Sequence, residues 1–173
     1  MARIEKATLN DIPALNELVN SAYRGDSSRA GWTTEADILD GIRTSESALS
    51  NLIQQGHTIL LLKDLSGQLI GSVQLEIHER GVYLGMLTVK PTLQGAGLGK
   101  LLLQAAESWA IEEGQAVVYM TVISVRSELI AWYERHGYQC TGETAPFPMD
   151  DPSFGLPKQV LEFIYLEKQL DNC

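Results

Sequence analysis

The chain has 173 residues, of which 13 are basic and 22 are acidic, so its formal net charge is −9. That length favours one domain, residues 1–173, around a single core, and the acidic balance disfavours nucleic acid and anionic membranes as partners but tolerates cations such as amines. The two cysteines are typical of a reducing compartment, and no apolar run resembles a signal peptide or a membrane span, so we expect a cytoplasmic protein.

The hydrophobic pattern predicts a mixed α/β fold. After a first strand, apolar side chains recur at helical spacing, with Asn10 and Asp11 as candidate N-caps of the first helix. From His57 the hydrophobic period shortens to the two-residue period of strands. Two short links that contain glycine then join three predicted strands, which indicates two hairpins. The expected elements are strand 3–7, helix 12–23, short helix 34–39, helix 45–55, strands 57–64, 68–79 and 82–89, helix 98–113, strand 116–123, helix 128–136, and strands 138–143 and 159–168 around a proline-rich loop, 145–157.

Two of the later elements carry more detailed predictions. Strand 116–123 is apolar nearly throughout, which fits a strand buried on both faces. The strand, helix and strand over 82–123 form the parallel crossover, and ligands of such sheets bind beyond a strand's carboxyl end, opposite a helix N-terminus. One face of helix 98–113 is expected to carry Leu98, Leu101, Leu102, Ala105 and Trp109.

Three glycines lie in LQGAGLGK, residues 93–100, between a predicted strand and a predicted helix. Glycines let the backbone approach a ligand, and the helix start offers N–H groups and about half a positive charge to a phosphate. The spacing argues against two nucleotide loops. Gln94 and Leu101 stand where a Walker A loop has Gly and Ser or Thr, and Lys100 stands where a dinucleotide fingerprint has its last glycine.

What does match is QGAGLG, residues 94–99, which resembles the pyrophosphate-binding motif of the GNAT superfamily of N-acetyltransferases. Two other stretches are similar to this family: the opening segment 3–24, and LIAWYERHGY, 129–138, in which Tyr133 precedes a glycine by four residues. The predicted element order is similar as well. The resemblance implies a mixed, mostly antiparallel sheet with one parallel strand pair, flanked by helices.

The same resemblance implies an acyltransferase that passes an acetyl group from acetyl-CoA to a primary amine by direct attack in a ternary complex. No metal is expected, and His57 and His136 lack metal-ligand spacing. Family members often carry asparagine seven residues before the tyrosine; Arg126 stands there, and it either reaches a CoA phosphate or lies on the surface. The expected cosubstrate-binding residues are Leu87, Thr88, Val89, Gln94, Gly95, Ala96, Gly97, Leu98, Gly99, Lys100 and Arg126.

Acetyl transfer to an amine needs a base and an acid. An alkylammonium with a pKa near 10.4 is neutral only about once in 2,500 molecules at pH 7. By resemblance Tyr133 protonates the leaving thiolate, unless it is a core tyrosine packed under the sheet. A backbone N–H of residues 87–89, where the parallel strands splay, would stabilise the oxyanion.

The base is less well defined by the sequence. Gln74, Glu76 and His78 share one face of their strand, so Glu76 could act on the amine directly or through water; a solvated sheet face is the alternative. Glu35 is the rival candidate, unless it serves a helix start.

The acceptor surface is expected to combine Trp32 and Glu35 with the proline-rich segment 147–157, which carries Phe147 and Phe154, because aromatics and acids suit a cation with an apolar body. Alternatively, both segments are apolar lids or the contacts of a homodimer. The predicted acceptor is a small molecule, an amino acid or a peptide. The alternatives are a protein N-terminal or lysine acetyltransferase, and a catalytically inactive module that binds acyl-CoA as a sensor or scaffold.

Overall fold

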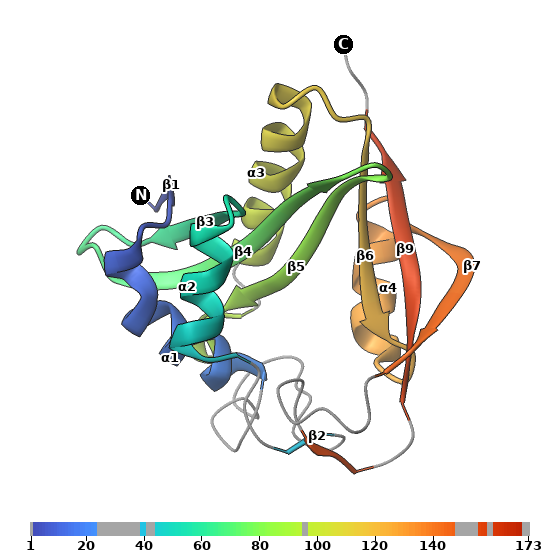
Figure 1. Ribbon diagram of the computed structural model, residues 1–173, viewed down its shortest axis with the longest axis horizontal. Helices are drawn as coiled ribbons and strands as arrows, with labels where there is room; N and C mark the ends of the chain where they lie inside the picture. The colour runs from blue at the N-terminus through green and yellow to red at the C-terminus, as the bar shows by residue number, and fades with distance from the viewer. Residues whose placement is uncertain are drawn as a thin grey trace.

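A mixed sheet runs through the whole molecule and carries helices on both faces (Figure 1). The computed structural model describes residues 2–23, 39–40, 44–94, 97–147, 156–158 and 161–170. In spatial order the seven strands of the sheet are β1 (Arg3–Lys6), β3 (Thr58–Lys63), β4 (Leu69–His78), β5 (Gly81–Val89), β6 (Val117–Ile123), β9 (Glu162–Gln169) and β7 (Gln139–Pro146). The helices are η1 (Leu9–Asp11), α1 (Ile12–Tyr23), α2 (Glu46–Gln54), η3 (Pro91–Leu93), α3 (Leu98–Glu112) and α4 (Ser127–Arg135).

The pairing of the sheet confirms the predicted fold class. Among the described strands, β5 and β6 form the one parallel pair, and the other neighbours in the large sheet are antiparallel. A separate antiparallel pair joins β2 (Leu39–Asp40) to β8 (Leu156–Pro157). In the described part of the chain, every helix is too short or too polar to cross a bilayer.

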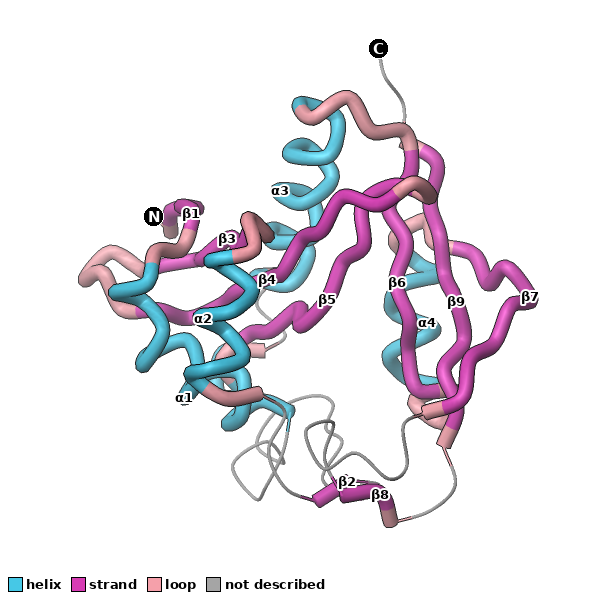
Figure 2. The backbone as a smooth tube through the Cα atoms, viewed as in Figure 1, coloured by secondary structure: helices cyan, strands magenta, loops and turns pink. Residues whose placement is uncertain are grey.

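Side-chain alternation along the strands separates two hydrophobic cores. Ile59 and Leu61 of β3 face α1 and α2, whereas Leu60 and Leu62 point to the opposite face, which α3 covers. The helices α1 and α2 cover only the N-terminal half of the sheet, and α4 lies behind β6 and β9 (Figure 2). The sheet therefore consists of two halves, β1-β3-β4-β5 and β6-β9-β7, joined along one parallel pair.

Most predicted element boundaries agree with the structure to within two residues, and α2 begins as expected, with Ser45 accepting a hydrogen bond from the Ala48 N–H at 3.2 Å. The first cap differs. Thr8 is the N-cap of η1, which runs straight into α1, so Asn10 and Asp11 lie inside the first helical segment. The Asp11 carboxylate turns back to accept the Thr8 N–H at 2.8 Å and so forms a capping box.

Three further predictions need correction or fall outside the described residues. The buried face of α3 carries Leu102, Leu103, Ala106 and Ala110, whereas Leu101 is 39% exposed. The predicted face is thus rotated by about one residue; of its members only Leu102 is fully buried. Strand β7 runs on to Pro146, into the predicted loop, and the predicted helix 34–39 lies outside the described residues except for its last residue, which belongs to β2.

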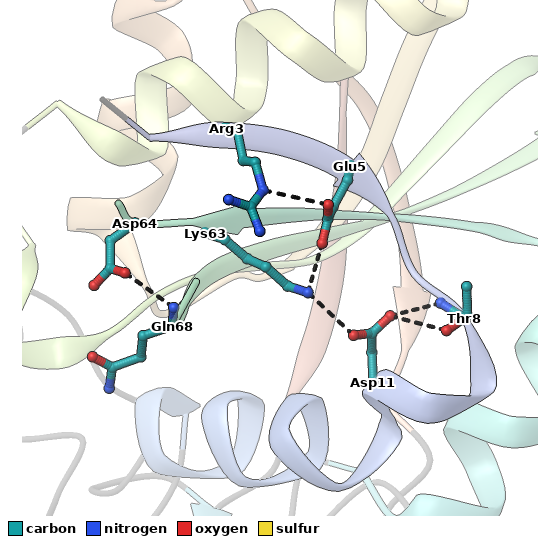
Figure 3. A network of polar contacts seen from close by, with 7 residues as sticks. All are labelled: Arg3, Glu5, Thr8, Asp11, Lys63, Asp64 and Gln68. Atoms are coloured by element: carbon teal, nitrogen blue, oxygen red, sulfur yellow. Dashed lines mark hydrogen bonds and ion pairs between the residues drawn. The ribbon is translucent and has the colours of Figure 1, made fainter. Parts of the chain in front are cut away.

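A network of charged side chains ties β1, η1 and β3 together at the edge of the N-terminal half (Figure 3). The Lys63 ammonium lies 2.6 Å from Glu5 Oε1 and 3.4 Å from Asp11 Oδ1. Lys63 and Glu5 belong to the N-terminal half of the sheet, and Asp11 ends η1, which follows β1, so this network supports that half without reaching the other.

Candidate active site

The parallel strands β5 and β6 separate soon after they begin. Their register contains only two pairs, Val82 with Val118 and Tyr83 with Tyr119. Beyond Tyr83 the two ribbons move apart (Figure 1). The sheet therefore has a closed end, at these two pairs, and an open end, where the backbones of the two strands no longer bond to each other.

A bulge in β5 lies at the open end. Ser72 of β4 pairs with Thr88 and Gln74 pairs with Gly85, so Met86 and Leu87 together face the single residue between them. Met86 has φ +49°, and it is the only non-glycine residue in the described part of the chain with a positive φ. Such a conformation is rare for a residue with a Cβ, and it persists where the surrounding structure imposes it.

The space between the separated strands is a pocket of about 190 Å³. Its walls come from β5, β6, the end of α1, helix α4 with its N-cap, Phe163 of β9, and Phe147, which follows β7. The lining residues are Tyr23, Tyr83, Leu84, Gly85, Met86, Leu87, Met120, Thr121, Val122, Ile123, Arg126, Leu129, Tyr133, Phe147 and Phe163. Most of these lining residues have apolar or aromatic side chains, so the polar groups among them define what can bind.

Tyr133 lies in the wall of this pocket and is only 4% exposed. Its ring makes edge contacts with Trp132 and Tyr138, at 5.1 and 5.8 Å between centroids. Burial raises the pKa of Tyr133 well above its usual value, the nearby Tyr23 adds to this rise, and Arg126 opposes it. Tyr133 is thus both a core residue and a pocket residue, and its phenol holds its proton firmly.

Arg126 lines the same pocket and is 5% exposed, which excludes the surface position that the sequence left open. Its guanidinium carbon lies 5.9 Å from the ring centroid of Tyr23. The Tyr23 hydroxyl donates a hydrogen bond of 2.9 Å to the carbonyl oxygen of Leu87, across the open end. A cation and two phenols therefore gather beside the bulged strand.

Sequence reasoning missed Tyr23 as a pocket residue, because its spacing only indicated the apolar face of a helix. The available signal was its position as the last residue of α1, where a polar aromatic can reach a neighbouring strand. Phe147, which was expected on the acceptor surface, does line this pocket, and Phe163, which was not predicted, lies beside it with 5.2 Å between the ring centroids.

The glycine loop comes after β5 and the short helix η3, and it precedes α3. Gly97 is the N-cap with φ +81°, and its lack of a side chain leaves the first N–H groups of α3 uncapped by a side chain. A Cβ on Gly99 would meet Trp132 of α4 at 3.4 Å and Val89 of β5 at 3.9 Å, so the start of α3 lies beside the open end. A helix start of this kind fits an anionic group such as a phosphate.

The other predicted loop residues have different surroundings. Gln94 turns back to donate a hydrogen bond of 3.1 Å to the carbonyl of Val89, and the Thr88 hydroxyl donates to Met86 O at 2.8 Å. Lys100 is exposed and Leu98 packs partly against the core. Of the three predicted strand residues, Leu87 lines the pocket, while Thr88 and Val89 are buried beside it.

Glu76 lies on β4, next to the site rather than in the pocket wall. Its Cα pairs with that of Tyr83, which does line the pocket. Its carboxylate contacts His57 Nδ1, accepts a hydrogen bond of 2.8 Å from Gln74, and lies 3.2 Å from His78 Nε2. The three-residue face predicted on β4 is therefore present, and His57 joins it from the start of β3, a partner that the sequence did not indicate.

Five of the predicted site residues lie outside the described part of the chain. They are Trp32, Glu35, Gly95, Ala96 and Phe154.

Comparison with known proteins supplies independent findings. Residues 36–147 match a family model described as the acetyltransferase (GNAT) domain. A curated dTDP-fucosamine acetyltransferase from Escherichia coli O6:H1 is 30% identical over 110 residues, which are 62% of this chain and 46% of that protein. The chain thus spans about half the length of that relative.

Solved structures with the same fold cover almost the whole chain. The ribosomal-protein-S18-alanine N-acetyltransferase of Escherichia coli superposes with a TM-score of 0.73 at 16% identity, over 99% of this chain and 95% of that one. A phosphinothricin acetyltransferase from Sinorhizobium meliloti, in complex with acetyl-CoA, gives a TM-score of 0.70 at 16% identity, over 98% and 88% of the two chains. At these identities the likeness concerns the fold.

Proposed function

Because the chain belongs to the GNAT acetyltransferase family and is therefore an acyltransferase, we propose that it transfers the acetyl group of acetyl-CoA to the primary amine of a small molecule. One observation carries the proposal: β5 and β6 part to leave a mostly apolar pocket whose polar groups include Tyr133, Arg126 and the backbone at Leu87. The curated relative, which acts on dTDP-fucosamine by its name, favours a small acceptor.

The proposed cosubstrate site runs from the start of α3 to this pocket. Residues 94–100 would hold the pyrophosphate, because the uncapped N–H groups and the positive end of the helix dipole favour an anion. Arg126 would place a second positive charge in the pocket wall. Acetyl-CoA supplies an activated acetyl thioester when it is bound, and the chain's own groups orient it and move protons.

Tyr133 is proposed as the general acid. Burial raises its pKa, which keeps the phenol protonated at neutral pH but opposes proton donation. The Arg126 charge acts in the other direction and would stabilise the phenolate that remains when the proton passes to the departing thiolate. A backbone N–H of residues 87–89 is proposed as the oxyanion donor, because the bulge interrupts the pairing with β4 at Met86 and Leu87, and Leu87 lines the pocket. One such donor contributes about 3 kcal/mol to the transition state.

Glu76 is proposed as the general base, acting through water past Tyr83. Removing the ammonium proton at pH 7 costs roughly 4.6 kcal/mol, so a carboxylate near the amine lowers the barrier. The contacts of Glu76 with His57 and Gln74 hold the carboxylate on the face that leads to Tyr83. The acidic balance of the chain, −9, also suits a cationic acceptor.

The experiment is an assay of free CoA thiol with purified protein, acetyl-CoA and a panel of amino sugars, amino acids, polyamines and N-terminal peptides. Thiol release that depends on a small amine supports the proposal. Release only with peptides favours a protein acceptor, which the likeness to the S18-alanine acetyltransferase fold makes the second candidate. Tight CoA binding without acceptor-dependent release would instead identify a binding module.

A further inference from the structure

The turn between β4 and β5 lies at the closed end of the sheet, directly beside the two pairs that join its halves. Gly81 follows this turn with φ +143°, and a Cβ there would lie 2.5 Å from the Val117 carbonyl oxygen. Only a residue without a side chain lets β5 start this close to β6. The residue before it, Arg80, therefore projects from the N-terminal half at the boundary with the C-terminal half.

The Arg80 side chain contacts all three strands of the C-terminal half. Its Nη1 and Nη2 donate to the two carboxylate oxygens of Glu143 on β7, at 3.1 and 2.8 Å. Nη2 also donates to Glu167 of β9 at 3.3 Å. The guanidinium carbon lies 4.9 Å from the ring centroids of both Tyr119 on β6 and Tyr165 on β9.

These contacts use features that arginine alone among the basic residues provides. The bidentate pair with Glu143 needs a planar fork of donors, and stacking on two rings needs a flat cation. The hydrogen bonds from Arg80 hold the pKa of Glu143 below its ordinary value, so this pair is ionised at neutral pH. A network with one bidentate pair is the arrangement in which a partly exposed ion pair contributes measurably.

A short chain of contacts leads from Arg80 to the pocket. The ring of Tyr119, under the guanidinium, makes an edge contact with Tyr83 at 5.5 Å between centroids. The Tyr83 hydroxyl lies 3.3 Å from the Thr121 hydroxyl, and Tyr83 and Thr121 both line the pocket. Side chains at the closed end therefore pack directly against side chains that line the pocket, across both β5 and β6.

We propose that Arg80 is a positioning residue that clamps the two halves of the sheet together and thereby sets the width of the pocket between β5 and β6. The proposal rests on the function proposed above insofar as the pocket is taken to receive acetyl-CoA. Without the clamp, the two backbone pairs and the shared hydrophobic core still hold β5 near β6, but the halves sample wider separations. The cosubstrate then binds a less populated conformation, which weakens its apparent affinity without changing the groups that react.

Lys63 offers a matched control. Like Arg80 it is a partly buried cation between two carboxylates, with 18% of its side chain exposed against 27% for Arg80. Its partners Glu5 and Asp11 lie in its own half of the molecule (Figure 3). Removing Lys63 therefore disrupts a similar ion-pair network and leaves the junction between the halves intact.

The test compares Arg80→Met, Arg80→Lys and Glu143→Gln with Lys63→Met. For Arg80→Met we expect the KM for acetyl-CoA to rise about fivefold with kcat within about twofold of wild type. Arg80→Lys and Glu143→Gln should give smaller rises, and Lys63→Met none. A loss of folded protein would lower kcat and leave KM unchanged, so a KM effect separates positioning from stability. An Arg80→Met enzyme with wild-type KM would overturn the clamp, as would an equal rise in Lys63→Met.

Amide hydrogen exchange tests the clamp without any ligand. We expect faster exchange over 82–89 and 117–123 in Arg80→Met, and unchanged exchange there in Lys63→Met. Unchanged exchange in Arg80→Met would overturn the clamp whatever the chemistry of the protein. Conversely, if wild-type protein transfers no acetyl group, the proposed function fails while the exchange result still decides on Arg80.

Discussion

The two ends of the β5–β6 junction use polar side chains in opposite ways. At the closed end, Arg80 and its carboxylates are partly exposed and satisfy one another. At the open end, Tyr133 and Arg126 are almost fully buried and border a pocket. Burying a polar group costs free energy, and buried polar groups that border a pocket are candidates for a functional site, whereas the partly exposed ion pairs of the closed end are candidates for a mechanical role.

The largest expected effect separates Tyr133 from a tyrosine that packs beside it. Tyr133→Phe should lower kcat about 100-fold or more, because a general acid is lost, and should leave the dissociation constant for CoA within about twofold. Tyr138→Phe is the matched control. Tyr138 is equally buried, but its hydroxyl donates to Glu107 at 2.9 Å, and it is not among the pocket residues.

Steady-state kinetics with saturating amine and calorimetric CoA titration measure both quantities. Tyr138→Phe should keep kcat and lower the free energy of unfolding by about 1 kcal/mol. Equal kcat in Tyr133→Phe and wild type would remove Tyr133 from the mechanism and leave it as a core residue.

The same substitution at a glycine of each end should have different effects on stability. Gly81→Ala forces a Cβ against the Val117 carbonyl as well as straining φ, so we expect a loss of about 3 kcal/mol. The new Cβ of Gly97→Ala meets no atom within 4 Å and the substitution strains only φ, so we expect the free energy of unfolding to fall by about 1 kcal/mol. Urea denaturation of both variants measures the difference. Equal losses would show that the closed end tolerates a wider separation of β5 from β6.

The Arg126 prediction tests whether burial at the open end reflects binding. Arg126→Met should raise the KM for acetyl-CoA about tenfold, which corresponds to losing one charged hydrogen bond of about 1.5 kcal/mol. Arg135→Met is the control, because Arg135 is exposed on the same helix. A KM that changes equally in both variants would indicate a general charge effect in place of a contact in the pocket.

How much the sequence could predict also differs between local and distant features. The hairpins and most helix boundaries follow from nearby residues, and the structure confirms them. The buried face of α3 was misjudged because three consecutive leucines, 101–103, fit several helical phases and only the opposing sheet chooses among them.

The functional geometry depends on contacts between residues far apart in the chain. Arg80 meets partners 63 and 87 positions away, and Tyr23 bonds to a carbonyl 64 positions away. No local pattern encodes such pairs. The positive φ of Met86 was equally unpredictable, because methionine has no preference for that conformation and the bulge follows from the pairing with β4.

The smallest expected effect is the change in stability and in kcat at alkaline pH, and it concerns the two buried phenols, Tyr133 and Tyr138. Burial raises the pKa of both Tyr133 and Tyr138 in the folded protein, whereas both titrate near 10 when unfolded. Their contribution to stability is therefore complete below about pH 10 and declines above it, as the unfolded chain loses protons that the folded chain keeps.

Because Tyr133 keeps its proton in the folded state, kcat should not fall between pH 8 and 10 on its account. A profile of kcat against pH at saturating substrates tests this. If wild type shows an apparent pKa between 8 and 10 and Tyr133→Phe does not, then water reaches the Tyr133 hydroxyl more freely than its burial implies.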